Sequence, residues 1–163
     1  QVLENIQKAA LRAADHGRLR PWRFLMIEGD GRKKLGELFI AAEKQKTDNL
    51  SEKKCELAAN KAMRAPTIVI VIACIKDHSR VPRIEQIISA GAAAQNMLTA
   101  AYAQGIGAVW RTGDLAYDSK FSAELGLTRN EAIVGFLYLG SASASCEAKA
   151  PKMNTEDYFQ SWP

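Results

Sequence analysis

The sequence has few of the residues on which catalytic and metal sites commonly depend. Its 163 residues include two histidines and three cysteines. Cys55, Cys74 and Cys146 are far apart and form no Cys-x-x-Cys pair, so we expect neither a disulfide framework nor a zinc site, but reduced thiols in a cytoplasmic protein. His16 and His78 are also distant from each other in sequence, which gives little support to a metal centre or a nucleophile–base pair.

Motifs of the common enzyme classes are absent as well. There is no Gly-x-Ser-x-Gly, no Gly-x-x-x-x-Gly-Lys and no His-Glu-x-x-His. Gly105-Ile-Gly107 precedes an expected strand, whereas a dinucleotide fingerprint follows one. A mechanism built on side chains alone is therefore not expected, and any reaction should depend on a bound cofactor.

The sequence also lacks a transmembrane segment and a strong charge bias. Its longest apolar pattern, residues 83–105, is interrupted by Glu85, Gln86, Gln95 and Asn96, and no signal peptide is recognisable, so no membrane association is expected. The net charge of +4 is spread along the chain. Such a charge suits anionic small molecules but is too weak to indicate nucleic-acid binding.

Hydrophobic periodicity predicts one domain over residues 1–163, in which helices separate the strands. Strands separated by helices predict a sheet covered on both faces, a three-layer α/β/α sandwich. The run at 67–73 is rich in β-branched residues and should form the centre of the sheet. The expected helices are 1–15, 32–43, 49–63, 83–105 and 119–125, and the expected strands are 22–28, 67–73, 107–113 and 131–139.

The predicted helix 83–105 should be buried and central. Its run Ala90–Ala94 has very little side-chain bulk. Tight packing against the sheet explains that run, and so does close approach of a partner helix or of a flat ligand. The polar tail 141–163 cannot form a core alone, so its Tyr158, Phe159 and Trp162 need another surface, for which a partner subunit is a candidate.

Two segments combine cations, hydrogen-bond donors and an aromatic ring at the end of a regular element. They are residues 12–22 (Arg-Ala-Ala-Asp-His-Gly-Arg-Leu-Arg-Pro-Trp) and 110–113 (Trp-Arg-Thr-Gly). Such a combination can hold a planar anionic ligand by charge-assisted hydrogen bonds and stacking. For each segment alone, core packing of Trp22 or Trp110 and a solvated rim of arginines is the simpler interpretation, but two such segments together favour a site.

The first of these segments resembles the Ala-Pro-Asp-His variant of a motif found in FMN-dependent nitroreductases, in particular the short bacterial NAD(P)H nitroreductases. The resemblance extends over nearly the whole chain, and its motifs are specific in combination and order. The further matching segments are Arg64-Ala-Pro66, Val81-Pro-Arg-Ile-Glu-Gln86, Ser89-Ala-Gly91, Ala103-Gln-Gly105, Trp110-Arg-Thr-Gly113 and Ile133-Val-Gly-Phe-Leu-Tyr-Leu-Gly140.

This resemblance implies an α+β fold with a central mixed sheet and a homodimer that binds FMN between its subunits. It implies a ping-pong reaction in which NADH or NADPH reduces the flavin and a small acceptor, such as a nitroaromatic or a quinone, reoxidises it. The resemblance places FMN contacts at Arg12, His16, Trp110, Arg111 and Thr112. It places weaker NAD(P) contacts at Ala100, Ala101, Tyr102, Ala103, Gln104 and Gly105.

The sequence departs from the family pattern in the first segment. Arg18 and Arg20 stand where the family has Asn or Ser and Gln, Ala14 stands for Pro, and the family's upstream Arg-Arg-Ser has no counterpart, as if an N-terminal segment were missing. Two alternatives remain open. One is an FMN-binding or storage protein with little turnover. The other is a basic module for an anionic partner or nucleic acid, formed by Arg18, Arg20, Arg23 and Arg32–Lys34.

Overall fold

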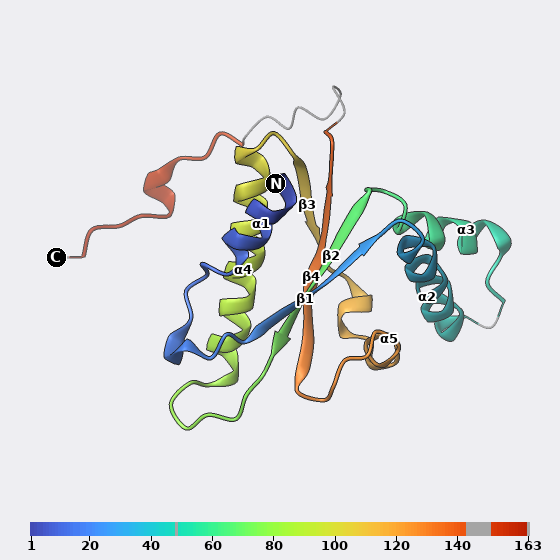
Figure 1. The fold of residues 1–163 in the computed structure, drawn as a ribbon, viewed down its shortest axis with the longest axis horizontal. Coiled ribbons are helices and arrows are strands. Elements are labelled where there is room, and N and C mark those ends of the chain that lie inside the picture. Colours follow the sequence, from blue (N-terminus) through green and yellow to red (C-terminus); the bar gives the residue numbers. More distant parts are fainter. Residues whose placement is uncertain (48, 143–150, 163) are drawn as a thin grey trace.

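The computed structural model describes residues 1–47, 49–142 and 151–162. Four strands form one sheet in the order β1-β2-β4-β3 (Figure 1). The inner strand β2 is buried except at its two ends, which explains its continuous apolar sequence, and the inner strand β4 is buried over most of its length. The strands are β1 (Trp22–Glu28), β2 (Thr67–Cys74), β3 (Gly107–Arg111) and β4 (Glu131–Gly140).

One face of the sheet is covered by α1 (Val2–Ala10) and α4 (Arg83–Ala103), which lie side by side at the left of Figure 1. Small residues of α4 let it approach the sheet closely: Ala93, Ala94 and Ala101 are fully buried against Val71 and Leu137. The predicted packing of the Ala90–Ala94 run against the sheet is therefore confirmed.

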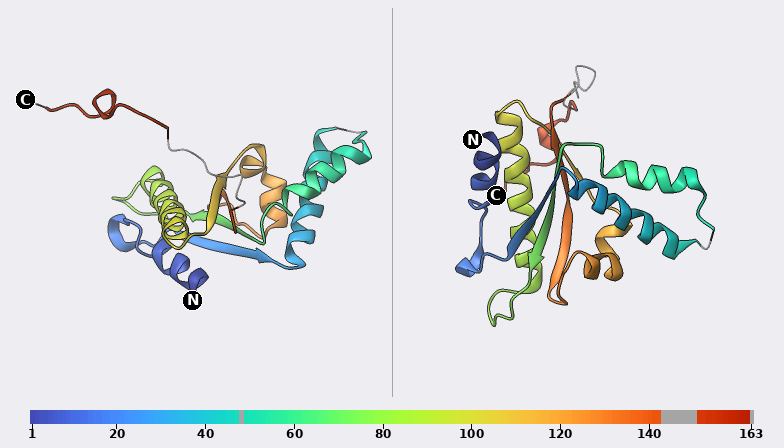
Figure 2. Two further views of the ribbon diagram at one scale, coloured as in Figure 1. Left: turned by 90° about the horizontal axis from the view of Figure 1, so that it is seen from above. Right: turned by 45° about the vertical axis from the view of Figure 1, so that its right-hand side comes forward.

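The opposite face is covered by α2 (Gly31–Lys46), α3 (Glu52–Lys61) and α5 (Ser119–Glu124) (Figures 1 and 2). Phe39, Phe121 and Phe136 form its aromatic centre, with ring centroids 5.7 to 6.2 Å apart. Short 3₁₀ turns complete the fold: η1 (His16–Arg18), η2 (Asp114–Tyr117) and η3 (Thr155–Asp157).

The predicted three-layer α+β architecture is confirmed, with one correction. A mixed sheet was expected, but all three pairings between the described strands are antiparallel. Neighbouring strands run in opposite directions throughout the sheet, so none of the described pairs has parallel hydrogen bonding.

A β-bulge in the centre of the sheet sets which side chains of β4 face each layer. Val71 pairs with Gly135 and Ile72 pairs with Ile133, so Val134 is the extra residue. The bulge shifts the alternation, and Ile133, Phe136 and Tyr138 all join the layer formed by α2, α3 and α5.

Two helix predictions need correction. The first helix ends at Ala10 rather than near residue 15, because the following residues turn away to reach the second turn of α4, where Ser89 Oγ donates to Ala14 O at 2.5 Å. The second concerns α4, which was expected to be buried. Ile84 and Ile88 are 59% and 62% exposed, because α4 buries only the sides that face the sheet and α1.

The C-terminal segment 151–162 extends away from the sheet in Figures 1 and 2. Its Tyr158, Phe159 and Trp162 are 66%, 78% and 95% exposed, so they find no surface within the described part of this chain. Residues 143–150 and 163 of the predicted tail, including Cys146, lie outside the described residues. Among the described helices, none is both long and apolar enough to cross a membrane.

Candidate functional site

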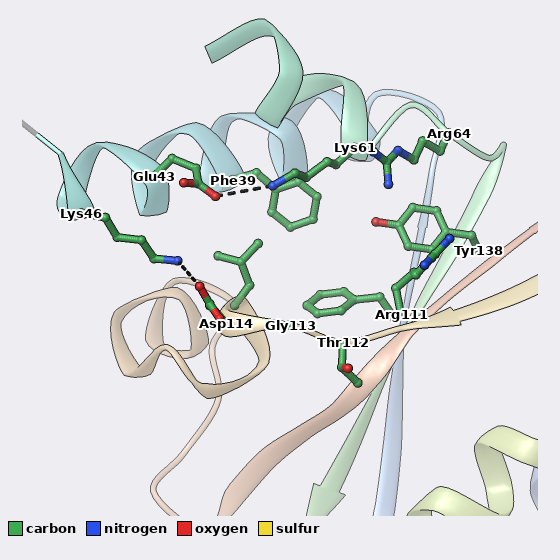
Figure 3. Close-up of a pocket in the computed structure, with 12 residues that line it drawn as sticks. Phe39, Glu43, Lys46, Lys61, Arg64, Arg111, Thr112, Gly113, Asp114 and Tyr138 are labelled. Carbon is green, nitrogen blue, oxygen red and sulfur yellow. Dashed lines mark hydrogen bonds and ion pairs between the residues drawn. The ribbon is translucent and has the colours of Figure 1, made fainter. Parts of the chain in front are cut away.

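A hollow of about 300 Å³ lies on the α2/α3 face of the sheet, beside the end of β3 (Figure 3). Strand β3 ends at Arg111, and the chain then turns through Thr112 and Gly113 into η2, which forms one wall. The hollow is lined by Phe39, Glu43, Lys46, Lys61, Arg64, Arg111, Thr112, Gly113, Asp114, Leu115, Phe136 and Tyr138.

The lining carries an excess of positive charge. It contains four cationic side chains and two carboxylates. Lys46 Nζ pairs with Asp114 Oδ2 at 3.1 Å, and Lys61 Nζ pairs with Glu43 Oε1 at 3.4 Å. Arg64 and Arg111 form no ion pair with any described residue, so they supply the excess. Two unpaired guanidinium groups on one wall are suited to a ligand that carries a phosphate.

Tyr138 lies between these two arginines and directs its hydroxyl group into the hollow (Figure 3). Burial raises the pKa of Tyr138, and the positive charges of Arg64 and Arg111 oppose that rise. The phenol therefore stays protonated at neutral pH. It can donate a hydrogen bond to a bound ligand.

The backbone at Gly113 offers a second point of approach. Its φ of 104° is one that residues with side chains rarely adopt, and no atom lies within 4 Å of the position that a Cβ would occupy. A flat ligand can therefore lie against the backbone there. Net positive charge, aromatic walls and open backbone together fit a phosphate-bearing planar cofactor such as FMN.

Trp110 does not line this hollow, although it directly precedes Arg111. Its indole lies on the α4 face, where Nε1 donates to Val134 O at 3.4 Å and the ring covers Gly135. The bulge at Val134 exposes that carbonyl group, and Gly135 leaves room for the ring. Trp110 is half-buried among the residues of the α1/α4 layer, so packing accounts for its position in a single chain.

The first predicted segment also lies on the α4 face. His16 Nδ1 is 2.5 Å from Glu85 Oε2 in the first turn of α4. Because the carboxylate accepts a hydrogen bond, Nδ1 carries the proton and Nε2 faces away from Glu85. Arg12 is exposed in the turn that follows α1. In one chain, therefore, Arg12 and His16 lie across the sheet from the hollow that Arg111 and Thr112 line.

The predicted NAD(P) segment, Ala100–Gly105, forms the other end of α4. It lies about 25 Å along the helix from Glu85. Gln104 is used internally, since Oε1 accepts from Asn5 Nδ2 at 2.9 Å and Nε2 donates to Ala100 O at 3.0 Å. Tyr102 is 86% exposed, and Ala101 is buried. No pocket described here is lined by this segment, so its role in nucleotide binding remains a prediction.

The basic module considered from the sequence has no geometric basis. Arg18 and Arg20 precede β1 and Arg32–Lys34 follow it, at opposite ends of a seven-residue strand about 20 Å long. Arg23 is used in a bidentate pair with Glu131, at 2.5 and 2.9 Å. The three groups therefore form no common patch.

Sequence reasoning missed Lys61, Arg64 and Tyr138, which line the hollow. Two of them lie in segments already recognised as family-like, namely 64–66 and 133–140. A signal was therefore present. What the sequence does not supply is the strand order, which brings the ends of α3 and β3 to the same part of the sheet.

Fold and site together define an α+β protein with a cationic, aromatic-lined ligand site at the end of an antiparallel sheet. The model of the Nitroreductase family matches residues 1–141. The chain is 39% identical over 145 residues to Putative NAD(P)H nitroreductase YdjA of Escherichia coli K12, covering 86% of this chain and 76% of that protein. It is 33% identical over 159 residues to a Haemophilus influenzae protein named Putative NAD(P)H nitroreductase, covering 97% and 85%.

Solved structures show the same fold. The nitroreductase-like family protein of Bacillus cereus superposes with a TM-score of 0.80 and 26% identity, over 99% of this chain and 83% of that chain. A protein of Desulfovibrio desulfuricans described as a putative nitroreductase, solved in complex with FMN, superposes with a TM-score of 0.72 and 20% identity, over 99% of this chain and 84% of that chain. The chain belongs to the Nitroreductase family and is an oxidoreductase of that family.

Proposed function

We propose that this chain is an FMN-dependent NAD(P)H oxidoreductase that reduces nitroaromatics, quinones or similar acceptors by a ping-pong reaction. The observation that carries the proposal is the pair of unpaired guanidinium groups, Arg64 and Arg111, beside the open backbone of Gly113. FMN, when bound, supplies the redox chemistry, accepting hydride from NADH or NADPH and passing electrons to the acceptor.

In this proposal the residues of the hollow bind and orient the cofactor. Arg64 and Arg111 would offset the negative charge of the FMN phosphate and of the reduced flavin ring. Thr112 and Tyr138 donate hydrogen bonds, and Gly113 lets the ring lie against the backbone. None of these residues needs to act as a general acid or base, which agrees with the absence of a catalytic motif.

We propose further that the working unit is a homodimer with a site shared between subunits. Arg12 and His16 lie across the sheet from the hollow, so a second copy is needed to bring such residues to it. The exposed side of α4, with Ile84, Ile88 and Tyr102, and the exposed aromatic residues of segment 151–162 supply apolar surface for that contact. Cys55 and Cys74 form no disulfide in the described part of the chain, which fits our proposal of a cytoplasmic protein.

A titration of FMN into the protein tests the site. Arg111→Ala and Arg64→Ala are each expected to weaken FMN binding by about tenfold or more, because a charge-assisted hydrogen bond contributes about 1.5 to 3 kcal/mol. Lys34→Ala removes an exposed cation at the start of α2 and is the control, with unchanged affinity expected. Unchanged FMN affinity in both arginine variants would remove the hollow from the site.

A further inference from the structure

The loop between α1 and β1 contains two arginines with strained backbone conformations. Arg18 has a φ of 54° and Arg20 has a φ of 49°. These are the only residues other than glycine with positive φ in the described part of the chain. Left-handed backbone is unfavourable for any residue that has a Cβ, and such strain tends to be kept at functional sites.

The surrounding structure holds this loop firmly. The Asp15 carboxylate accepts hydrogen bonds from the backbone N–H groups of Leu19 at 3.1 Å and Arg20 at 2.7 Å. Lys76 Nζ donates to Leu19 O at 2.5 Å, and His16 is paired with Glu85. These contacts, from within the loop, from α4 and from the loop after β2, compensate for the strain at Arg18 and Arg20.

The guanidinium groups of Arg18 and Arg20 take no part in these contacts. Arg18 and Arg20 are both exposed, and neither forms an ion pair or a side-chain hydrogen bond with any described residue. The carboxylate of Asp15, the nearest acidic residue in sequence, already accepts hydrogen bonds from the backbone N–H groups of Leu19 and Arg20. The loop therefore presents two unpaired positive charges, two residues apart, on a fixed backbone. A dianionic phosphate monoester matches two such charges, whereas a single carboxylate leaves one unmatched.

We propose that Arg18 and Arg20 bind the 2′-phosphate of NADPH and make this protein select NADPH over NADH. This inference rests on the proposed function, since it requires the loop that carries His16 to stand beside the flavin of the partner subunit. A nicotinamide ring stacked on that flavin would leave the adenosine half of the dinucleotide free to extend towards the exposed side of this loop. Arg18 and Arg20 follow His16 on the same loop, on its exposed side.

The test compares 2′,5′-ADP with 5′-AMP by calorimetric titration, with the protein equilibrated with FMN and its FMN occupancy recorded from the visible spectrum. The native protein is expected to bind 2′,5′-ADP about tenfold or more tightly than 5′-AMP. The double variant Arg18→Gly/Arg20→Gly should lose that preference and bind 5′-AMP as before. Its melting temperature should not fall, because glycine adopts positive φ without strain.

The double variant Lys53→Gln/Lys54→Gln is the matched control. It removes two exposed positive charges on α3, which covers the opposite face of the sheet, and should keep the preference for 2′,5′-ADP. An equal loss in the control would assign the effect to net charge and overturn the proposal. The ratio of kcat/KM for NADPH to that for NADH should fall in the arginine variant only.

Other outcomes also decide the matter. If FMN binds but the native protein does not distinguish 2′,5′-ADP from 5′-AMP, the inference is overturned while the proposed function stands. If FMN does not bind, the proposed function fails. The affinities for 2′,5′-ADP and 5′-AMP are then measured on the FMN-free protein, and equal affinities there overturn the inference as well. A variant that loses affinity for 4-nitrobenzoate relative to nitrobenzene, with its NADPH preference intact, would assign the loop to the acceptor and overturn the inference.

Discussion

Replacing Glu131 by glutamine is expected to lower the stability of the fold and to change its dependence on pH. Glu131 begins β4, and its carboxylate accepts hydrogen bonds from Arg23 of β1, from Thr128 N and from the Cys74 thiol of β2. The Arg23 guanidinium, more than any other group, holds the pKa of Glu131 at about 2, against an ordinary 4.5. Burial raises the pKa of the Cys74 thiol to about 11, so that group remains a hydrogen-bond donor.

The size of the effect follows from that shift. A depression from 4.5 to about 2 corresponds to about 3 kcal/mol, at 1.36 kcal/mol per pKa unit. The Arg23 side chain is 35% exposed, and solvent screening reduces the contribution to about 2 kcal/mol. Because the folded-state pKa lies below the unfolded one, this stability is fully present above about pH 5 and is lost as the pH falls towards 2.

Urea unfolding followed by circular dichroism at pH 7 and at pH 3 measures both consequences. Glu131→Gln should lower the free energy of unfolding at pH 7 by about 2 kcal/mol and should lose less stability than the native protein on going to pH 3. Glu124→Gln, at an exposed carboxylate in α5, is the control and should change neither value. If Glu131→Gln unfolds with the pH dependence of the native protein, the depressed pKa contributes nothing and the reasoning is refuted.

Two further predictions concern packing and assembly. Gly135→Ala should destabilise the fold by about 2 kcal/mol or more in thermal unfolding, because a Cβ would lie 1.9 Å from Trp110 Nε1. Gly91→Ala is the control, since its Cβ would be 3.8 Å from the same indole. It should leave the stability unchanged or slightly raised. A Gly135→Ala protein as stable as the native one would mean that the indole moves freely. Ile84→Glu/Ile88→Glu should convert a dimer to monomers in light scattering while the circular dichroism spectrum is kept, and a dimer of unchanged strength would place the interface elsewhere.

Most helices and all four described strands could be predicted because their sequences agree with their surroundings. The run Ile68–Ala73 of β2 is apolar at every position because both faces of that strand are covered, and Gly29-Asp30-Gly31 marks the turn before α2. Helix ends were less predictable. Ala13 continues the apolar pattern of α1, but the helix ends before it, at Ala10, and Ala14 O accepts a hydrogen bond from Ser89 of α4.

The composition of the site depends on long-range contacts that periodicity does not describe. Trp110 and Arg111 are adjacent in β3, and strand geometry sends neighbouring side chains to opposite faces of the sheet, so a segment that looks like one site contributes to two layers. Tyr138 appears in sequence as one more apolar residue of β4. Its direction into the hollow follows from the bulge at Val134, and the neighbouring Gly135 is the local sign of that bulge in the sequence.

The account depends most directly on whether flavin bound by this chain is reduced by a nicotinamide nucleotide and reoxidised by a small acceptor. The measurement is the visible absorption of the protein with FMN, without oxygen, after NADPH is added and then after a nitroaromatic or a quinone. The account predicts that the flavin band bleaches much faster than that of free FMN and recovers when the acceptor arrives. Flavin that stays bound but bleaches no faster than free FMN would contradict the account and favour a storage protein.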